Sequence, residues 1–419
     1  MNLGANIDPF DAWLSVLPNG WSLKKIGREF SCIGSGTTPP TDSPKWYGEG
    51  YPWVTTGELR ENLLTATEKS VTLDATREFT TLRRYPPGTL LVAMYGATIG
   101  RLALLGCEAT TNQACCALSE PLNLEPKYVF YWLQAFREQL IRKASGGGQP
   151  NVNQNTIREL KISAPVRASQ QFIANFLDDK TARIDALIAE KEQLLELLNE
   201  HRLSVSAQVL AEAPSGLQAK LGFCVDLLPG YAFPSDEFSR DAGNIPLLRG
   251  INVAPASIRW DETVYWPREY ESSLERFRLQ QGDVVLGMDR PWISSGARVA
   301  MIDEDSAGSF LLQRVCRLRG GTRLTQRFLF FALVSDEFRQ SVEVDLTGVS
   351  VPHLSPEQIL RFKVPVLTVD EQRVRCDVAD RQLLKIEQLE AHTLQMLDRL
   401  REYRSSLISA AVTGQLPIE

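Results

Sequence analysis

Short motifs in this sequence recur in the same order about 200 residues further along the chain. Three pairs of segments carry the repeat: Pro87–Met94 with Gln281–Met288, Gln113–Leu118 with Gln313–Leu318, and Pro165-Val166 with Pro365-Val366. The separation grows from 194 to 200 residues, as insertions in the loops between matched strands would produce. Because ordered self-similarity indicates a repeated structural unit, we expect two copies of one domain.

Each copy ends in a long segment without glycine or proline, which predicts an uninterrupted helix. The two segments cover about residues 169–210 and 369–412. The regions before them contain short β-branched and aromatic runs separated by Gly, Pro and Asn, a pattern typical of strands and loops. We therefore predict an α+β fold with two pseudo-symmetric domains, mostly β with some helix. The expected boundaries are 1–165 and 214–365 for the two domains, and 166–213 and 366–419 for the helices.

Both helical segments carry residues at seven-residue spacing, the pattern of a coiled coil. The first has the rows Ile184, Lys191, Leu198, Val205 and Leu187, Leu194, His201; the second has Leu383, Glu390, Leu397, Arg404 and Ile386, Thr393, Leu400, Leu407. A lone helix of this length would expose its apolar stripe to water. We therefore expect the two helices to pack on each other as an antiparallel coiled coil, with the core of an ordinary bundle as the alternative.

The sequence offers no recognisable catalytic motif. It lacks a P-loop, a dinucleotide-binding Gly-x-Gly-x-x-Gly and a Gly-x-Ser-x-Gly elbow. Two of its three histidines, His201 and His392, fall in the helical segments, where a surface or seam position is the commoner role. Cys115 and Cys116 are adjacent, which is not a metal-ligand spacing. These features favour a binding protein with no catalytic residue, metal or cofactor of its own.

Composition sets further limits. The chain has no apolar run of the ~18 residues that a membrane span needs and no signal-peptide pattern. Its seven cysteines fit reduced thiols, so we expect a cytoplasmic protein. The net charge of -6 at pH 7 argues at first sight against nucleic acid. However, five of these six net charges lie in the two helical segments, which leaves the β domains close to neutral.

Two similar domains on a paired-helix strut suit a target with two half-sites at a fixed spacing, such as duplex DNA. The chain also resembles, over nearly its whole length, the specificity subunits of type I restriction–modification systems. The motifs that carry the resemblance are Leu17–Trp21, Gly36–Pro39, Tyr51–Val54, the two Pro-Val junctions with Gln170–Ile173 and Glu371-Gln372, and the ending Arg404–Leu416. In the second copy, Leu228–Ser235 and Ile245–Gly250 look like a variant of the family's domain opening.

The resemblance implies a non-catalytic subunit whose two target-recognition domains each read half of a bipartite DNA site. The paired helices would set the gap between the halves and dock two methylation subunits. Those partners would bind S-adenosylmethionine, and two restriction subunits would use ATP and Mg²⁺ to translocate and cut DNA. The second copy lacks the Leu-Pro-x-Gly-Trp and Gly-x-Thr-Pro motifs of the first, so we expect the two domains to read unrelated half-sites.

Candidate DNA contacts are polar residues in the predicted loops, because Arg, Lys, Asn and Gln read base edges while hydroxyls often bind phosphates. In the first domain these are Thr37, Thr38, Lys45, Tyr47, Tyr95, Asn112, Gln113, Gln149 and Asn151. In the second they are Arg249, Asn252, Arg290, Trp292, Ser294, Ser295, Arg298, Gln313, Arg314 and His353. Any one of them could instead form a surface ion pair, and the recurring Gln113 and Gln313 could be structural strand residues.

A different class of function stays open: a coiled-coil scaffold whose β domains bind protein or carbohydrate. The acidic isoelectric point favours that alternative. An adenine methyltransferase fused into this chain is a poor hypothesis, because no Asn-Pro-Pro-aromatic tetrapeptide occurs in the sequence.

Overall fold

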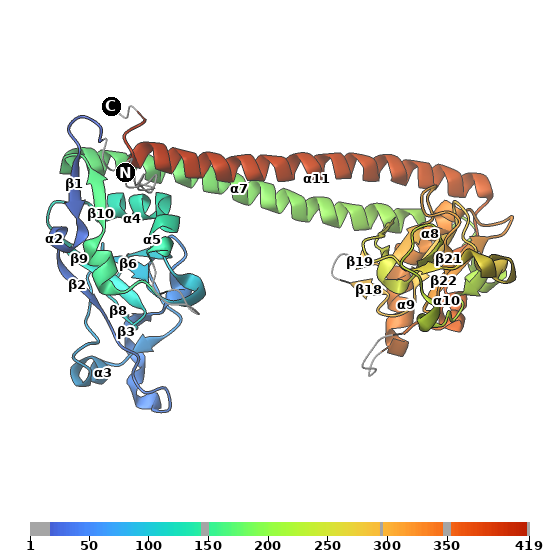
Figure 1. The fold of residues 1–419 in the computed structure, drawn as a ribbon, viewed down its shortest axis with the longest axis horizontal. Coiled ribbons are helices and arrows are strands. Elements are labelled where there is room, and N and C mark those ends of the chain that lie inside the picture. Colours follow the sequence, from blue (N-terminus) through green and yellow to red (C-terminus); the bar gives the residue numbers. More distant parts are fainter. Residues whose placement is uncertain (1–16, 144–150, 294–295, 347–352, 417–419) are drawn as a thin grey trace, which may run out of the picture. The chain divides into compact units, whose positions relative to one another are not determined.

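The computed structural model describes residues 17–416 except 144–150, 294–295 and 347–352. The chain divides into two compact units, Met1–Lys191 with Gln395–Glu419, and Glu192–Leu394. Each unit holds one β-rich domain together with one part of each long helix (Figure 1). The duplication predicted from sequence is therefore present as two structural copies.

In unit 1 the strands are β1 (Ser22–Lys25), β2 (Phe30–Ser35), β3 (Tyr47–Val54), β4 (Asn62–Leu64), β5 (Ser70–Val71), β6 (Leu90–Ala93), β7 (Leu102–Leu105), β8 (Thr110–Thr111), β9 (Cys115–Pro121) and β10 (Lys161–Ala164). The helices are α2 (Ile26–Glu29), α3 (Leu73–Glu78), α4 (Pro126–Ala135), α5 (Arg137–Arg142), α6 (Gln154–Glu159) and the first part of α7 (Arg167–Val209). Short 3₁₀ turns are η1 (Pro44–Trp46), η2 (Thr56–Glu58) and η3 (Gly96–Thr98).

In unit 2 the strands are β11 (Gln218–Lys220), β12 (Val225–Pro229), β13 (Ile245–Leu248), β14 (Val253–Ala254), β15 (Ser257–Ile258), β16 (Tyr265–Trp266), β17 (Val284–Gly287), β18 (Trp292–Ile293), β19 (Gly296–Ala297), β20 (Val299–Met301), β21 (Phe310–Leu311), β22 (Val315–Gly320) and β23 (Lys363–Pro365). The helices are α8 (Gln326–Val334), α9 (Asp336–Leu346), α10 (Pro356–Arg361) and the first part of α11 (Val369–Val412). The 3₁₀ turns are η4 (Leu221–Phe223), η5 (Ser235–Glu237), η6 (Gly250–Asn252) and η7 (Arg268–Phe277).

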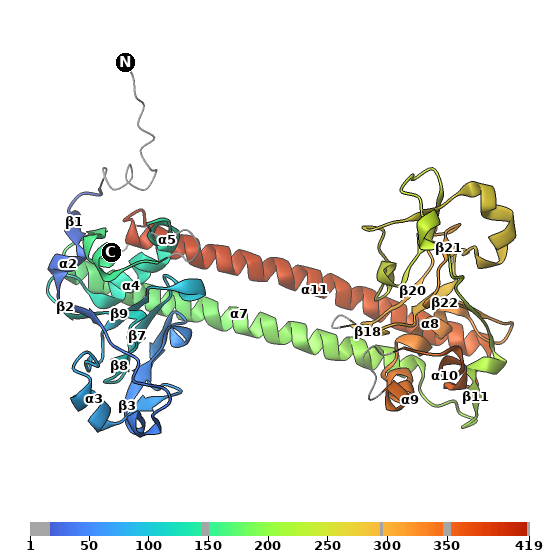
Figure 2. The same cartoon turned by 60° about the horizontal axis from the view of Figure 1, so that its bottom comes forward.

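The two units share one sheet plan. The central sheet has the order β2-β9-β6-β7-β4 in unit 1 and β12-β22-β17-β20 in unit 2. A second sheet has the order β5-β3-β8 in one and β16-β13-β21 in the other, and each contains one parallel pair. The first strand of each domain, β1 or β11 (both labelled in Figure 2), pairs with the strand that directly precedes the long helix, β10 or β23. This matching order extends the sequence repeat to the strands that the motifs did not cover.

The central strands are apolar on both faces, which explains their unbroken hydrophobic runs. In β6, Leu90 and Val92 pack into the cluster beneath α4, while Leu91 and Ala93 pack into a cluster on the other face. Because side chains alternate along a strand, one run of four apolar residues supplies both clusters. In unit 2, Val285 likewise packs on the face opposite its neighbours in β17.

The start of each long helix is fixed to its domain by a buried glutamine. The side-chain amide of Gln170 donates to the carbonyls of Asn123 and Pro165, and its oxygen accepts from the N–H of Glu125 at 2.8 Å. The second copy repeats these three bonds with Gln372. An uncharged side chain can satisfy two carbonyls and one N–H at once only if it has both donors and an acceptor, as an amide has.

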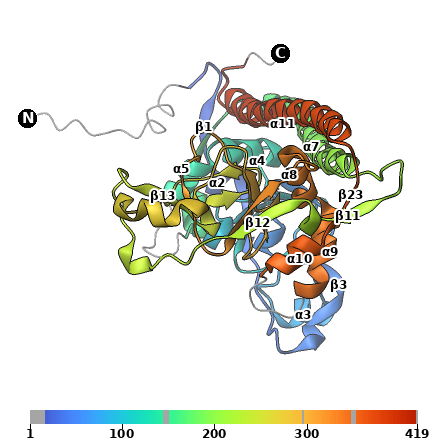
Figure 3. The same ribbon diagram turned by 90° about the vertical axis from the view of Figure 1, so that its right-hand side faces the viewer.

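Within each unit the two long helices lie side by side (Figure 3). In unit 2, Arg202 of α7 pairs with Glu390 of α11, whereas Arg375, earlier in α11, donates to the carbonyl of Val209, later in α7. In unit 1 the pair is Arg404 with Asp185 at 2.8 Å. The predicted antiparallel packing is therefore confirmed within each unit.

The structure supports both predicted rows of α11 but one row of α7. Ile184 and Leu198 are buried, as are Ile386, Leu397 and Leu407, while Leu383, Leu400 and Leu194 are half-buried. Leu187, in contrast, is 44% exposed, so placing it in the helix seam was wrong. In the structure, the second row of α7 begins four residues after Ile184, at Ile188, and not three residues after it, at Leu187. Ile188 packs on the unit 1 core. Spacings of three and four residues both suit a seam, so periodicity alone did not choose between them.

The second domain does have a counterpart of the first domain's opening. Pro18–Trp21 precedes β1 and Pro214–Leu217 precedes β11, with Gly20 and Gly216 at φ values of 80° and 65°. The segment interpreted as a variant opening, Leu228–Ser235, lies at the end of β12, where Gly230 occupies the position of Gly36. At both glycines a Cβ would lie within 2.1 Å of a backbone carbonyl oxygen, so neither site tolerates a side chain.

Candidate nucleic-acid interface

In unit 1, a buried methionine at the end of β6 brings three loops together. The N–H of Met94 donates to the carbonyl of Ala114 at 2.9 Å, and its carbonyl accepts from Val152 at 3.0 Å. The next residue, Tyr95, forms a β-bridge with Asn151. Segments that are far apart in sequence thus form one polar edge at the end of the central sheet.

Unit 2 builds the same edge with the same backbone bonds. The N–H of Met288 donates to the carbonyl of Arg314, and its carbonyl accepts from Leu354, both at 2.8 Å. Asp289 then forms a β-bridge with His353, as Tyr95 does with Asn151. The two copies therefore hold different side chains on equivalent backbone.

The side chains of the unit 1 edge are uncharged hydrogen-bonding groups. Gln113 is exposed, and its Oε1 accepts from the Thr38 hydroxyl at 2.6 Å, so this bond uses the amide oxygen and none of its N–H groups. Tyr95 and Asn151 are exposed beside it. Asn112 is half-buried and caps the turn by accepting from the N–H of Ala114. An exposed amide with its oxygen fixed is a group that can read a base edge.

A second group of predicted residues lies next to the smaller sheet. The Trp53 indole donates to the carbonyl of Thr37 at 3.1 Å, and the Tyr47 hydroxyl donates to the carbonyl of Pro39 at 2.7 Å. Lys45 is exposed, with its Nζ 4.2 Å from the centroid of the Trp46 ring. The aromatic side chains thus brace the loop, while the lysine supplies its cation.

The unit 2 edge is charged. The carboxylate of Asp289 accepts from Nδ1 of His353 at 2.5 Å and from Nη1 of Arg314 at 2.8 Å. Burial by itself raises the pKa of Asp289, but the hydrogen bonds from His353 and Arg314 outweigh it, so the net pKa is lowered. Arg290 is exposed on the same loop, and Trp292 is half-buried against Phe338 with ring centroids 5.9 Å apart.

Three residues predicted to contact DNA form hydrogen bonds within their own domain, and one of them, Asn252, is buried. Asn252 is 2% exposed and satisfies both the N–H of Arg249 and the carbonyl of Arg259, so its prediction as a DNA contact was wrong. Arg249 donates to the carbonyl of Glu262. Arg298 donates to the carbonyls of Val253 and Asp289, and burial lowers its pKa. These side chains hold the η6 loop beside the charged edge.

Of the remaining candidates for DNA contact, the structure describes Gln313 but not the other three. Gln313 is exposed and directly precedes Arg314 of the unit 2 edge, and its N–H donates to the carbonyl of Tyr231 at 2.8 Å. Gln149, Ser294 and Ser295 lie outside the described residues.

Comparison with known proteins finds relatives in sequence and in fold. Residues 18–197 match the model of the type I restriction modification DNA specificity domain. The specificity subunit of the type I restriction enzyme MjaVIII from Methanocaldococcus jannaschii is 22% identical over 96% of this chain and 94% of its own length. That of EcoAI from Escherichia coli is 32% identical over 163 residues, which are 38% of this chain and 27% of that one.

The chain is thus similar, over nearly its whole length, to specificity subunits of type I restriction enzymes. Solved structures share its fold. A chain from a study of complex assembly and conformational transition of the type I R-M system has a TM-score of 0.76 and 15% identity, and covers 96% of this chain and 100% of its own. The HsdS subunit from Thermoanaerobacter tengcongensis has a TM-score of 0.60 and 16% identity, and covers 96% and 98%.

Asp289 was not among the residues predicted from the sequence. A search for DNA contacts favours hydrogen-bond donors, and a carboxylate is repelled by phosphate. The signal was available in the repeat, because Asp289 follows Met288 as the candidate Tyr95 follows Met94. Its importance lies in the two donors that it holds.

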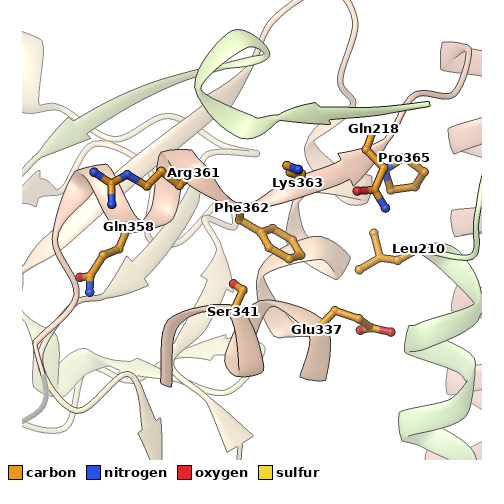
Figure 4. A pocket seen from close by; sticks show the side chains of 9 residues that line it. All are labelled: Leu210, Gln218, Glu337, Ser341, Gln358, Arg361, Phe362, Lys363 and Pro365. Carbon is orange, nitrogen blue, oxygen red and sulfur yellow. The ribbon is translucent and has the colours of Figure 1, made fainter. Parts of the chain in front are cut away.

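One hollow in unit 2 is lined by none of the residues of the two edges. It measures about 400 Å³ and has an apolar floor that includes Leu210 and Phe362, with Arg361, Lys363 and Glu337 at its rim (Figure 4). No predicted DNA contact lines it. Among the described residues no group of three or more His, Cys, Asp or Glu could hold a metal ion, and no helix is long and apolar enough to cross a bilayer.

Proposed function

We propose that this chain is a specificity subunit that recognises a bipartite DNA sequence, with one half-site for each domain. The observation that carries the proposal is the duplicated three-loop edge, where Met94 and Met288 form equivalent backbone bonds. At equivalent positions one edge has Tyr95, Ala114 and Asn151, and the other has Asp289, Arg314 and His353. Gln113 and Gln313 recur on both edges. A shared scaffold with different polar groups supports two unrelated half-sites on one duplex.

The paired helices act as the ruler and as the dock for partners in this proposal. Helix α7 has 43 residues and α11 has 44, and at ~1.5 Å per residue each is ~65 Å long. Both helices contribute to both units, so their length bears on the distance between the half-sites. Two methylation subunits would dock on this part of the chain, and two restriction subunits would join the complex.

Catalysis belongs to those partners in the proposal. The methylation subunits would supply S-adenosylmethionine chemistry on adenine, and the restriction subunits would use ATP and Mg²⁺. The specificity subunit would act in the cytoplasm without a cofactor. Its near-neutral β domains predict weak DNA affinity in the absence of partners, because non-specific binding depends on Lys and Arg contacts to phosphate.

A footprint of the complex with its methylation subunits tests the proposal. We expect two protected half-sites on one duplex, and binding that weakens steeply as salt rises. Insertion of seven residues into both α7 and α11 should lengthen the preferred gap and leave both half-site sequences unchanged. Equal affinity for either half-site alone, with no dependence on the gap, would refute the two-half-site model.

A further inference from the structure

At the charged edge of unit 2, the carboxylate of Asp289 holds the side chain of Arg314 in place by a hydrogen bond. The side chain of Asp289 is 23% exposed, whereas those of Arg314 and His353 are 69% and 50% exposed. One carboxylate oxygen binds each partner, so the two donors are fixed at neighbouring positions. These three residues are called the Asp289 triad below.

The backbone is strained at Arg314 of the triad and at Arg290, the residue after Asp289. Arg314 adopts φ 68° and Arg290 adopts φ 44°, in the left-handed region that residues other than glycine rarely occupy. The carbonyl of Arg314 accepts from the buried Met288, and Asp289 is bridged to His353. Such conformations persist where the surrounding structure imposes them, and they concentrate at functional sites.

Arg314 keeps enough donors to read a base. A guanidinium has five N–H groups, and one of those on Nη1 is used by Asp289, so four stay available. Guanine presents two adjacent acceptors, N7 and O6, in the major groove, and a planar guanidinium bonds to both at once. Because Asp289 already orders the side chain, binding a base loses less rotamer freedom than it would with a free arginine.

We infer that the Asp289 triad reads a guanine in the half-site of the second domain, with Arg314 as the base-contacting residue and Asp289 as its positioning residue. This inference rests on the proposed function. Unit 1 has no such device, because the equivalent positions hold Tyr95, Ala114 and Asn151. The guanine requirement therefore belongs to one half-site of the two.

Selection from a randomised duplex library tests the inference. The full chain, assembled with its methylation subunits, is used to capture duplexes, which are then sequenced. We expect one position of the second half-site to be guanine in the selected pool. Arg314→Ala should reduce that preference by about tenfold or more, and leave every position of the first half-site unchanged.

Conservative variants separate base contact from general charge. Arg314→Lys keeps the cation but loses the planar fork, so it should retain overall affinity and lose the guanine preference. Asp289→Asn keeps an acceptor of the same shape without the charge, and should weaken the same single preference to a smaller extent. The matched control is Arg339→Ala, which removes an exposed arginine paired with Glu343 on α9 and should leave the profile unchanged.

The outcomes distinguish this inference from the proposed function. A selected bipartite sequence whose profile is the same with Arg314→Ala and Arg314→Lys refutes the guanine contact and leaves the proposed function standing. Equal loss of preference at all positions refutes it as well, because the effect would then be structural. If the unsubstituted complex selects no sequence at all, the proposed function fails and the inference fails with it.

Discussion

Replacing the buried Gln170 tests how the long helix is fixed to its domain. Gln170→Ala removes three hydrogen bonds, to the carbonyls of Asn123 and Pro165 and from the N–H of Glu125. Each bond contributes about 1 kcal/mol net, and a buried group left unpaired costs about 1–3 kcal/mol. We therefore expect unit 1 to lose about 3–5 kcal/mol of unfolding free energy.

Thermal unfolding and amide hydrogen exchange measure that loss. For a unit of this size, 1 kcal/mol lowers Tm by about 2–4 °C, so a fall of at least ~6 °C is expected. The amide of Glu125 should exchange faster, because its acceptor is gone. The control is Gln171→Ala, since Gln171 is the exposed neighbour on the same helix. If the two variants unfold within ~1 °C of each other, the hydrogen bonds of Gln170 do not fix the helix to its domain.

Further predictions concern the helix seam and the buried thiols. In denaturant unfolding, Leu198→Ala should lower the unfolding free energy by about 2–5 kcal/mol, whereas Leu187→Ala, at an exposed position, should lower it by less than about 1 kcal/mol. Equal losses would show that Leu187 does lie in the helix seam, as the sequence predicted. Burial raises the pKa of Cys316 to about 12, so iodoacetamide at pH 8 should modify the half-buried Cys224 well before Cys316. Because the folded-state pKa of Cys316 is the higher one, its stabilising contribution is present below pH 9 and declines between pH 9 and 12, and an alkaline unfolding series should show that loss.

The acidic isoelectric point illustrates how net charge can mislead. Polar and charged DNA candidates concentrate at two edges of near-neutral domains, while most of the net negative charge lies in the helical segments. Within unit 2, the negative charge of Asp289 lies beside Arg314 and His353, and its hydrogen bonds hold both side chains in place. The distribution of charge over the fold decides DNA binding, and the total does not.

Much of this architecture could be predicted from the sequence. The duplication, the two helices and both heptad rows of α11 followed from motif order and periodicity, which are local properties of the chain. Tertiary structure decided what periodicity leaves open. It placed Leu187 outside the seam, because steps of three and four residues are equally regular until a partner helix selects one.

The tertiary structure also decided which candidates are available to a ligand. Asn252 and Arg314 are both polar loop residues in the sequence, yet one is buried in its own loop and the other is exposed. Asp289 acquired its role from partners 25 and 64 positions away. Hydrogen-bond partners are set by which distant segments the backbone brings together, and that information appears only when the chain is folded.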